Sequence, residues 1–296
     1  MNKYAVAFLT SSNYYIYTQV ALLSFVGHNQ WFIENNYDII IILCEDIDNF
    51  NKGIFQKIYP NIIFINNENS KWKDLLLYYY NKTELINDQL AYNSFYNKDN
   101  KFNRYLDRFI IFDLKEYDKI IYFDSDIIIN QSCYDLFVND TNQFSIALHS
   151  SYHELLDNKY INYNDFINKY NYNEPIGTCT GILICNPKTN TSISFEQLKQ
   201  FIKENYNKEK NLGYYQIDEI LINDYLFYQS KEIGNNIYIL PQNIMAYNDS
   251  IISDITQYKC IHYFFDPLSD FIQNSNMSIL WNNYLFKLLN MIYYKK

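Results

Sequence analysis

Two aspartates, Asp124 and Asp126, stand one residue apart in a segment that is otherwise almost wholly apolar. Neighbouring carboxylates repel each other, and aspartate is rarely buried unless it is paired or bound to a metal. In an extended segment the side chains of residues i and i+2 point to the same side, so both carboxylates can face one ion. Hard divalent cations bind such oxygens and keep further positions for phosphate oxygens. The pair therefore predicts a metal site for a diphosphate.

The residues around the pair favour this interpretation over a simple turn. An Asp-Ser-Asp sequence can also form an Asx turn that ends one strand and leads into the next. Here apolar and aromatic residues precede Asp124 and three isoleucines follow Asp126, as at the end of a buried parallel strand. Ligand sites in open α/β sheets gather at the carboxyl ends of such strands.

Arginine is scarce, and its placement adds a candidate contact for phosphate. Arg104 and Arg108 are the only arginines and stand four residues apart, on one face of a predicted helix. The guanidinium group suits bidentate binding of phosphate or carboxylate. Two surface arginines are the alternative, mainly for Arg104.

Four more positions have both a structural and a functional explanation. Asp218 and Glu219 form a second acidic pair at the start of a predicted helix, where they either complement the helix dipole or belong to the candidate site. His262 ends an apolar segment and is either a core imidazole or a nitrogen ligand for Mn²⁺. Gly181 is one of six glycines, and it either makes a turn before a strand or lets the backbone approach a ligand closely.

Length and composition bound the class of protein. The 296 residues contain no linker, charge block or repeat, which predicts one large α/β domain. The net charge of −9 argues against a general nucleic-acid binder, because such a protein needs a basic face. The five cysteines form no C-x-x-C pair, so we expect buried free thiols rather than a zinc site or a disulfide framework.

The two ends of the chain carry expectations about location and partners. The first predicted strand begins at Tyr4, which leaves no room for a signal peptide, and no apolar run reaches transmembrane length, so we expect a cytoplasmic protein. The tail over residues 278–296 predicts an amphipathic helix that packs on its own domain or on a second copy in a homodimer. Peripheral contact of this tail with a membrane is the alternative.

Apolar runs alternate with helical patterns along the chain, which predicts a doubly wound, largely parallel sheet. Besides the strand that begins at Lys119, the predicted strands cover residues 4–9, 38–44, 61–65, 144–148, 181–185, 237–240 and 258–263. The polar set 10–13 is expected to cap the first helix, which ends at about residue 28, and further helices are predicted over residues 46–58, 71–96, 102–114, 195–206 and 216–227. No G-x-G-x-x-G or Walker A loop follows the first strand, which disfavours a dinucleotide oxidoreductase and a P-loop NTPase.

In their order along the chain, these motifs resemble glycosyltransferase family 8, the retaining enzymes of the GT-A fold that include glycogenin and the lipopolysaccharide galactosyltransferases. The resemblance runs from Ala5 to about Pro267. It implies metal binding by Asp124, Asp126 and His262, and contacts to the donor sugar or phosphates by Asp218, Glu219 and Arg108 as the catalytic residues. It also implies a nucleotide site formed by Thr10, Ser12, Asn13, Tyr17, Arg108, Asp124, Ser125 and Gly181.

The resemblance also implies an architecture and an activity. The expected fold is a single Rossmann-like GT-A domain of mixed, mostly parallel sheet over residues 1–275, followed by a C-terminal amphipathic helix over 276–296. Within the domain, residues 1–130 form the nucleotide-binding half and 131–275 the acceptor-side half. The implied reaction is Mn²⁺- or Mg²⁺-dependent transfer of a hexose, with retention of configuration, from a UDP-sugar of the UDP-glucose or UDP-galactose type to a glycan, protein or lipid acceptor.

The chain departs from the family pattern at three places. Glu219 stands where glutamine is usual, and Cys179 stands where asparagine is usual. After His262 the family has a Gly and a Lys-Pro-Trp whose lysine contacts the diphosphate, but this chain has Tyr-Phe-Phe-Asp-Pro. Lys231 and Lys259 are the candidates to replace that lysine.

Two other functions remain open at this point. A protein of the same fold that binds nucleotide sugars but has lost turnover is the first alternative. A D-x-D phosphatase of the haloacid dehalogenase type is the second. It is disfavoured by Ile128, where such enzymes have threonine or valine, and by the distance of the motif from the N-terminus.

Overall fold

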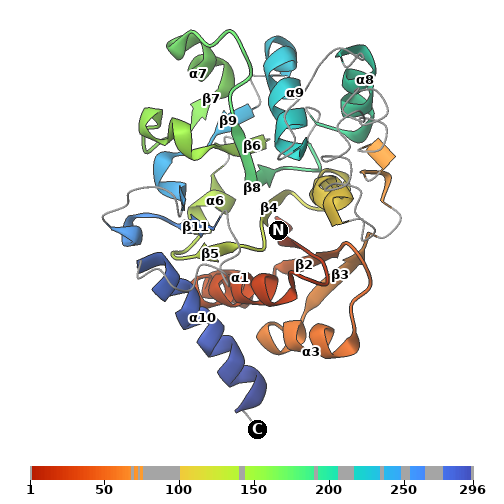
Figure 1. The fold of residues 1–296 in the computed structure, drawn as a ribbon, viewed down its shortest axis with the longest axis vertical. Helices are drawn as coiled ribbons and strands as arrows, with labels where there is room; N and C mark the ends of the chain where they lie inside the picture. The colour runs from red at the N-terminus through yellow and green to blue at the C-terminus, as the bar shows by residue number, and fades with distance from the viewer. Residues whose placement is uncertain are drawn as a thin grey trace, which may run out of the picture.

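The computed structural model describes residues 2–67, 70–72, 74–75, 101–139, 144–189, 193–205, 217–233, 237–247, 254–263 and 276–294. Most of the helix predicted over residues 71–96 lies outside these ranges. Within them, strands and helices alternate along the chain as the sequence predicts (Figure 1).

A mixed sheet forms the centre of the molecule. Among the described residues it has eight strands, in the order β3 (Ile62–Asn66), β2 (Asp38–Leu43), β1 (Tyr4–Thr10), β4 (Lys119–Phe123), β8 (Thr178–Cys185), β6 (Phe144–Leu148), β9 (Ile237–Ile239) and β7 (Ile161–Asn162). Strands β3, β2, β1 and β4 are mutually parallel, β8 is antiparallel to both of its neighbours, and β9 is parallel to β6. The predicted α/β fold with a mixed, mostly parallel sheet is confirmed.

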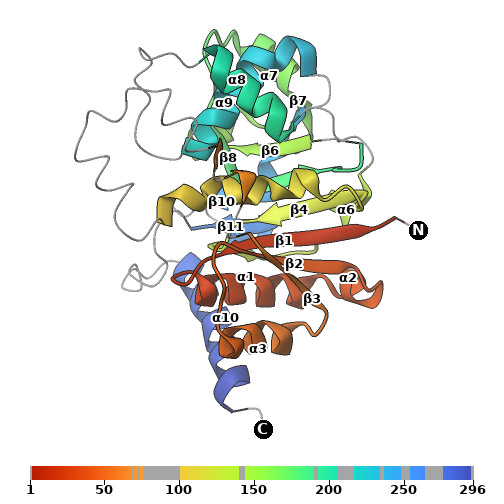
Figure 2. The same cartoon turned by 90° about the vertical axis from the view of Figure 1, so that its right-hand side faces the viewer.

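The sheet is buried on both faces, as the alternating side chains of β1 illustrate. Its side chains alternate between two hydrophobic clusters, with Val6 and Phe8 in one and Ala5 and Ala7 in the other. Figure 2 shows helices on both sides of the sheet. The Phe8 face is covered by α1 (Tyr15–His28), α2 (Gln30–Glu34), α3 (Asn49–Ile58), α6 (Tyr134–Val138) and α10 (Asn276–Tyr293). The Ala7 face is covered by the 3₁₀ helix η2 (Lys101–Asp113), α7 (Tyr163–Tyr170), α8 (Phe195–Asn205) and α9 (Ile217–Ile233).

A second, small sheet corrects one prediction. The segment 258–263 is expected to close the main sheet, but its strand β11 (Cys260–His262) pairs with β10 (Met245–Tyr247) and β5 (Ile127–Ile129) instead. Strand β5 begins directly after the aspartate pair and offers an apolar partner, against which the short apolar run of β11 forms a three-residue antiparallel ladder. Periodicity alone cannot specify which edge so short a strand joins.

Three helices also differ from the sequence prediction. Helix α3 begins at Asn49 rather than at residue 46, because the Asp48 carboxylate accepts the N–H of Asn51 and caps it there. Helix α1 begins at Tyr15 without a side-chain cap, so the polar set 10–13 does not cap it. The helix predicted over 102–114 is the 3₁₀ helix η2, whose buried Leu106, Phe109 and Phe112 recur at the three-residue period of that winding.

The tail forms helix α10, which packs against α1. Its Trp281, Tyr284 and Leu288 are buried in the cluster that also contains α1, and the hydroxyl of Tyr284 lies 2.7 Å from Nε2 of His28. Figure 1 shows its C-terminal half extending past the body of the molecule. Among the described helices, none has the length and apolar composition that crossing a bilayer requires.

Candidate metal-binding site

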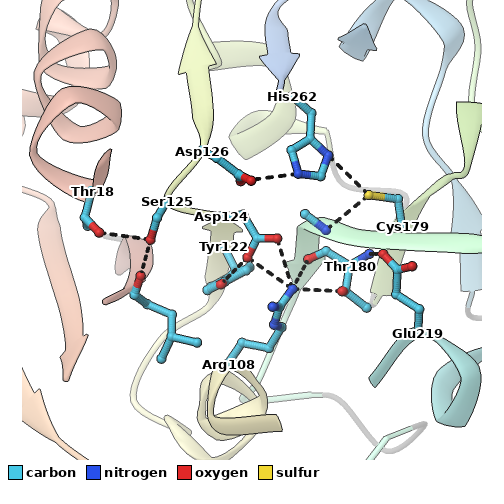
Figure 3. A network of polar contacts seen from close by, with 12 residues as sticks. Thr18, Arg108, Tyr122, Asp124, Ser125, Asp126, Cys179, Thr180, Glu219 and His262 are labelled. Carbon is cyan, nitrogen blue, oxygen red and sulfur yellow. Dashed lines mark hydrogen bonds and ion pairs between the residues drawn. The ribbon is translucent and has the colours of Figure 1, made fainter. Parts of the chain in front are cut away.

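Asp124, Asp126 and His262 come together where the two sheets meet. The chain leaves β4 at Phe123 and enters β5 at Ile127, so the two aspartates lie in the link between the sheets. Strand β11 pairs with β5 so that His262 is opposite Ile127, which brings the imidazole beside the pair. Each of the three side chains offers one ligand atom, and these atoms lie within 4.8 Å of one another (Figure 3). Two carboxylates and one imidazole are a donor set that could hold a divalent metal ion.

Asp124 is held by two neighbours. The Nη1 atom of Arg108 lies 3.1 Å from both carboxylate oxygens, and the hydroxyl of Tyr122 donates to Oδ1 at 2.5 Å. Tyr122 precedes Asp124 by two residues, so its side chain lies on the same side of the extended segment. Burial raises the pKa of the Asp124 carboxyl and the Arg108 guanidinium opposes that rise. The carboxylate is thus oriented from two directions.

Arg108 lies where the sequence predicts, next to the aspartate pair, and is only 5% exposed. Besides Asp124, it donates to the Thr180 carbonyl at 3.2 Å and to the Thr180 hydroxyl at 2.8 Å. Its guanidinium carbon also lies 5.4 Å from the centre of the Tyr122 ring. The side chain of Arg104 lies outside the described part of the structure.

The segment Cys179-Thr180-Gly181 of β8, which we call the β8 segment, contacts His262, Glu219, Arg108 and Asp124. The Cys179 sulfur lies 3.5 Å from Nδ1 of His262, the Thr180 N–H donates to Glu219 Oε1 at 3.1 Å, and the Gly181 carbonyl accepts the Asp124 N–H at 2.9 Å. Sequence reasoning missed the roles of Cys179, Thr180 and Tyr122. Their signal was weak, because each is an ordinary strand residue. The partners of Cys179 and Thr180 lie far away in the sequence, and Tyr122 is one of 32 tyrosines.

The pKa values of three buried groups depart from their ordinary values. Burial raises the pKa of the Tyr122 hydroxyl and of the Cys179 thiol. Burial lowers the pKa of His262, but the neighbouring Cys179 sulfur and the Asp126 carboxylate outweigh it and place this pKa well above the ordinary value. The Asp126 carboxylate oxygen lies 3.3 Å from Nε2 of the ring.

The predicted nucleotide residues of the first loop lie at the carboxyl end of β1. The hydroxyls of Thr10 and Ser125 lie 2.8 Å and 2.9 Å from that of Thr18, and Ser125 donates to the Leu9 carbonyl, which ties the D-x-D link to β1. Ser12 is exposed, and its N–H donates to the Glu45 carboxylate at 2.6 Å.

The other predicted residues of this loop differ in exposure. Asn13 is exposed, whereas Tyr17 is buried with its ring against Trp281 of α10. The structure thus brings Thr10 and Ser125 together and turns the Tyr17 ring into the core between α1 and α10.

The acidic pair of α9 lies in its first turn. Glu219 is 8% exposed and faces the β8 segment through Thr180, whereas the side chain of Asp218 lies outside the described part of the structure. Of the two lysines that are candidates to contact phosphate, Lys259 forms an ion pair with Asp135 at 3.0 Å. The side chain of Lys231 also lies outside the described part.

Comparison with known proteins gives no match at the level of sequence and a clear one at the level of fold. No protein-family model matches the sequence, and no curated protein sequence matches it. Among solved structures, the chain resembles the galactosyltransferase LgtC, solved with donor and acceptor sugar analogues. The TM-score is 0.56 at 14% identity, over 99% of this chain and 97% of that one.

Two further solved structures are similar. The glycosyltransferase GlyE of Streptococcus pneumoniae TIGR4 has a TM-score of 0.56 at 17% identity, over 98% of this chain and 63% of that one. Mouse xyloside xylosyltransferase 1 has a TM-score of 0.53 at 12% identity, over 88% of this chain and 97% of that one. At these identities the likeness concerns the fold: the chain has the fold of the GT-A glycosyltransferases.

Proposed function

We propose that the protein is a metal-dependent, retaining glycosyltransferase that moves a hexose from a UDP-sugar to a glycan, protein or lipid acceptor. The observation that carries the proposal is the meeting of Asp124, Asp126 and His262 at the carboxyl end of β4, in a chain with the fold of glycosyltransferases. This location agrees with the general behaviour of open α/β folds, which bind nucleotides at the carboxyl ends of their strands.

The three side chains would hold Mn²⁺ or Mg²⁺. When bound, the metal acts as a Lewis acid that stabilises the charge of the departing diphosphate. The chain's own residues prepare for it. Arg108 and Tyr122 fix the rotamer of Asp124, and the Arg108 charge opposes the rise that burial causes in the pKa of this carboxyl.

The residues around Asp124, Asp126 and His262 would contact the donor at two ends, the nucleoside and the sugar. Thr10, Ser12 and Asn13 would form the nucleoside end, with Ser125 and Gly181 beside the phosphates, whereas the Tyr17 ring lies in the core and would not contact the donor. Asp218 and Glu219 would face the sugar. Glu219 is tied to the β8 segment through the Thr180 N–H, so a contact with the sugar would be rigidly connected to Arg108 and to the metal ligands.

Hydrolysis of nucleotide sugars in the presence of Mn²⁺ tests this function. We expect the wild type to release UDP from at least one UDP-hexose, and Asp126→Ala to abolish that release. The matched control is Asp165→Ala, which removes an exposed aspartate from the first turn of α7. Tight UDP binding without turnover of any donor or acceptor would show instead a binding protein that keeps the fold. Phosphate release from simple phosphomonoesters would show the phosphatase alternative.

Helix α10 would contribute the contact with a second copy or with a lipid surface. Ile279, Phe286 and Tyr293 follow one another at seven-residue intervals along α10 and are between 54% and 69% exposed. Flotation with liposomes and sedimentation of the chain with and without residues 278–296 separate the two partners.

A further inference from the structure

We propose that Cys179 is a positioning residue of the metal site. In this proposal its sulfur accepts a hydrogen bond from Nδ1 of His262 and so presents Nε2 to the carboxylate pair. The inference rests on the proposed function, because it takes His262 as a metal ligand. It assigns a role to the cysteine at the position where the resembled family has asparagine.

The two nitrogens of His262 have different partners. Nδ1 lies 3.5 Å from the Cys179 sulfur and Nε2 lies 3.3 Å from Asp126 Oδ1. Figure 3 shows the sulfur and the carboxylate on different sides of the ring. An imidazole binds a metal through the nitrogen that carries no hydrogen, so Nδ1 must carry the hydrogen when Nε2 is the ligand. A buried ring then needs an acceptor at Nδ1, and metal-bound histidines regularly have one.

The environment of the sulfur fits the role of acceptor. The N–H of Gly181 donates to the same sulfur at 3.4 Å, so the backbone of β8 already holds it in place. Cys179 is fully buried and His262 is 5% exposed. Gly181 also leaves the space in which the ring lies, since a β-carbon there would be 2.8 Å from Cε1. The sulfur therefore determines the rotation of a ring whose position is already confined.

The test is Mn²⁺ affinity, measured from the electron paramagnetic resonance signal of the free ion, on the full chain without a donor substrate. Cys179→Ala should raise the dissociation constant about tenfold, the lower end of the effect of removing the partner of a metal-bound histidine. Cys179→Ser, whose hydroxyl can also accept, should stay within about threefold of the wild type. Cys185→Ala is the matched control, because Cys185 is a buried thiol at the other end of the same strand.

A double-mutant cycle with His262→Gln tests whether Cys179 affects Mn²⁺ affinity through the imidazole of His262. If Cys179 acts through the imidazole, then Cys179→Ala should leave the Mn²⁺ affinity of the His262→Gln variant unchanged. Thermal unfolding of each variant is measured in parallel. A merely structural role would lower the midpoint of unfolding and leave the affinity of the folded protein as it was.

The possible failures can be distinguished. A wild type that does not bind Mn²⁺ overturns the proposed function together with this inference. If His262→Gln weakens Mn²⁺ binding while Cys179→Ala binds as the wild type does, the metal site stands and the role of Cys179 is wrong. Equal loss of affinity from Cys179→Ala in both backgrounds also overturns that role.

Discussion

The backbone of Gly181 packs directly against the imidazole ring of His262. A β-carbon at residue 181 would lie 2.8 Å from Cε1 and 3.0 Å from Nδ1 of that ring, closer than nonbonded atoms approach. Both residues lie in strands, and the ring is buried on the side of the site that Cys179 closes. The sequence left two explanations for Gly181, a turn before a strand or a close approach to a ligand. In the structure Gly181 lies within β8, and the group that it approaches is the ring of a candidate metal ligand. Gly181 therefore determines where His262 can lie.

This contact predicts that Gly181→Ala disrupts metal binding. The added methyl group must displace the His262 ring, because the new β-carbon would otherwise lie 2.8 Å from Cε1. We expect a loss of stability of about 1–3 kcal/mol, as for other overpacked sites, and a clear loss of Mn²⁺ affinity. Urea denaturation and Mn²⁺ titration measure the two effects.

The control for this substitution is Gly53→Ala. Gly53 lies in α3, and a β-carbon there would meet no atom within 4 Å. Alanine should stabilise that helix by about 0.5–1 kcal/mol and leave Mn²⁺ affinity unchanged. If Gly181→Ala behaves in the same way, His262 is not confined as described.

The hydroxyl of Tyr122 is predicted to orient Asp124. Tyr122→Phe keeps the buried ring but removes the donor to Oδ1, so the carboxylate loses one of its two fixed contacts. A hydrogen bond to a charged group contributes about 1.5–3 kcal/mol, so we expect a loss of stability of that size and weaker Mn²⁺ binding. Tyr163→Phe is the control, because the hydroxyl of Tyr163 is buried but has no hydrogen-bond partner among the described residues. Equal effects of the two substitutions would contradict the prediction.

The buried pair of Arg108 and Asp124 predicts a large effect of removing one partner. Arg108→Met leaves the Asp124 carboxylate without its counterion, which should cost about 3–5 kcal/mol in urea denaturation. Adding Asp124→Asn removes the unpaired charge and should restore part of that loss. Lys188→Met, which breaks the exposed pair with Asp118 at 2.9 Å, serves as a control. It should cost less than about 1 kcal/mol.

The aspartate pair could be located from the sequence because its signal is local. β4 ends at Phe123, where the sequence changes from apolar to acidic residues, and such a change is typical of the carboxyl end of a buried strand. Arg108 could be placed near it for a similar reason, since it lies in the last helical segment before that strand. The alternation of strands and helices also fixed the fold class.

The rest of the site depends on contacts between distant strands. His262 reaches Asp126 only because the three residues of β11 pair with β5 rather than with the main sheet, and no local pattern specifies that choice. The β8 segment reaches the site because β8 runs antiparallel to β4, which brings Gly181 beside Asp124. Cys179 and Thr180 are typical strand residues, so their roles emerge only once this register is known.

The attachment of the C-terminal helix is predicted to depend on pH through His28. This residue ends α1, and its Nε2 lies 2.7 Å from the hydroxyl of Tyr284 in α10. Burial lowers the pKa of His28 below its ordinary value of 6.5, and the Lys287 charge lowers it further. Below pH 6.5, His28 takes up a proton more readily in the unfolded chain than in the folded protein. Lowering the pH therefore stabilises the unfolded state relative to the folded state. The stability that His28 contributes is therefore present above 6.5 and is lost as the pH decreases through the lowered pKa.

Comparison of the wild type with His28→Gln isolates this contribution. The raised pKa of His262 acts in the opposite direction, since its contribution is lost as the pH rises, but it is common to both proteins. The free energy of unfolding of the wild type should therefore decrease more steeply than that of His28→Gln as the pH falls from about 7.5 to about 5. Lys287→Met should make the decrease shallower, because it removes the second cause of the lowered pKa. Identical slopes for the wild type and His28→Gln would show that the contact with α10 does not lower the pKa of the imidazole.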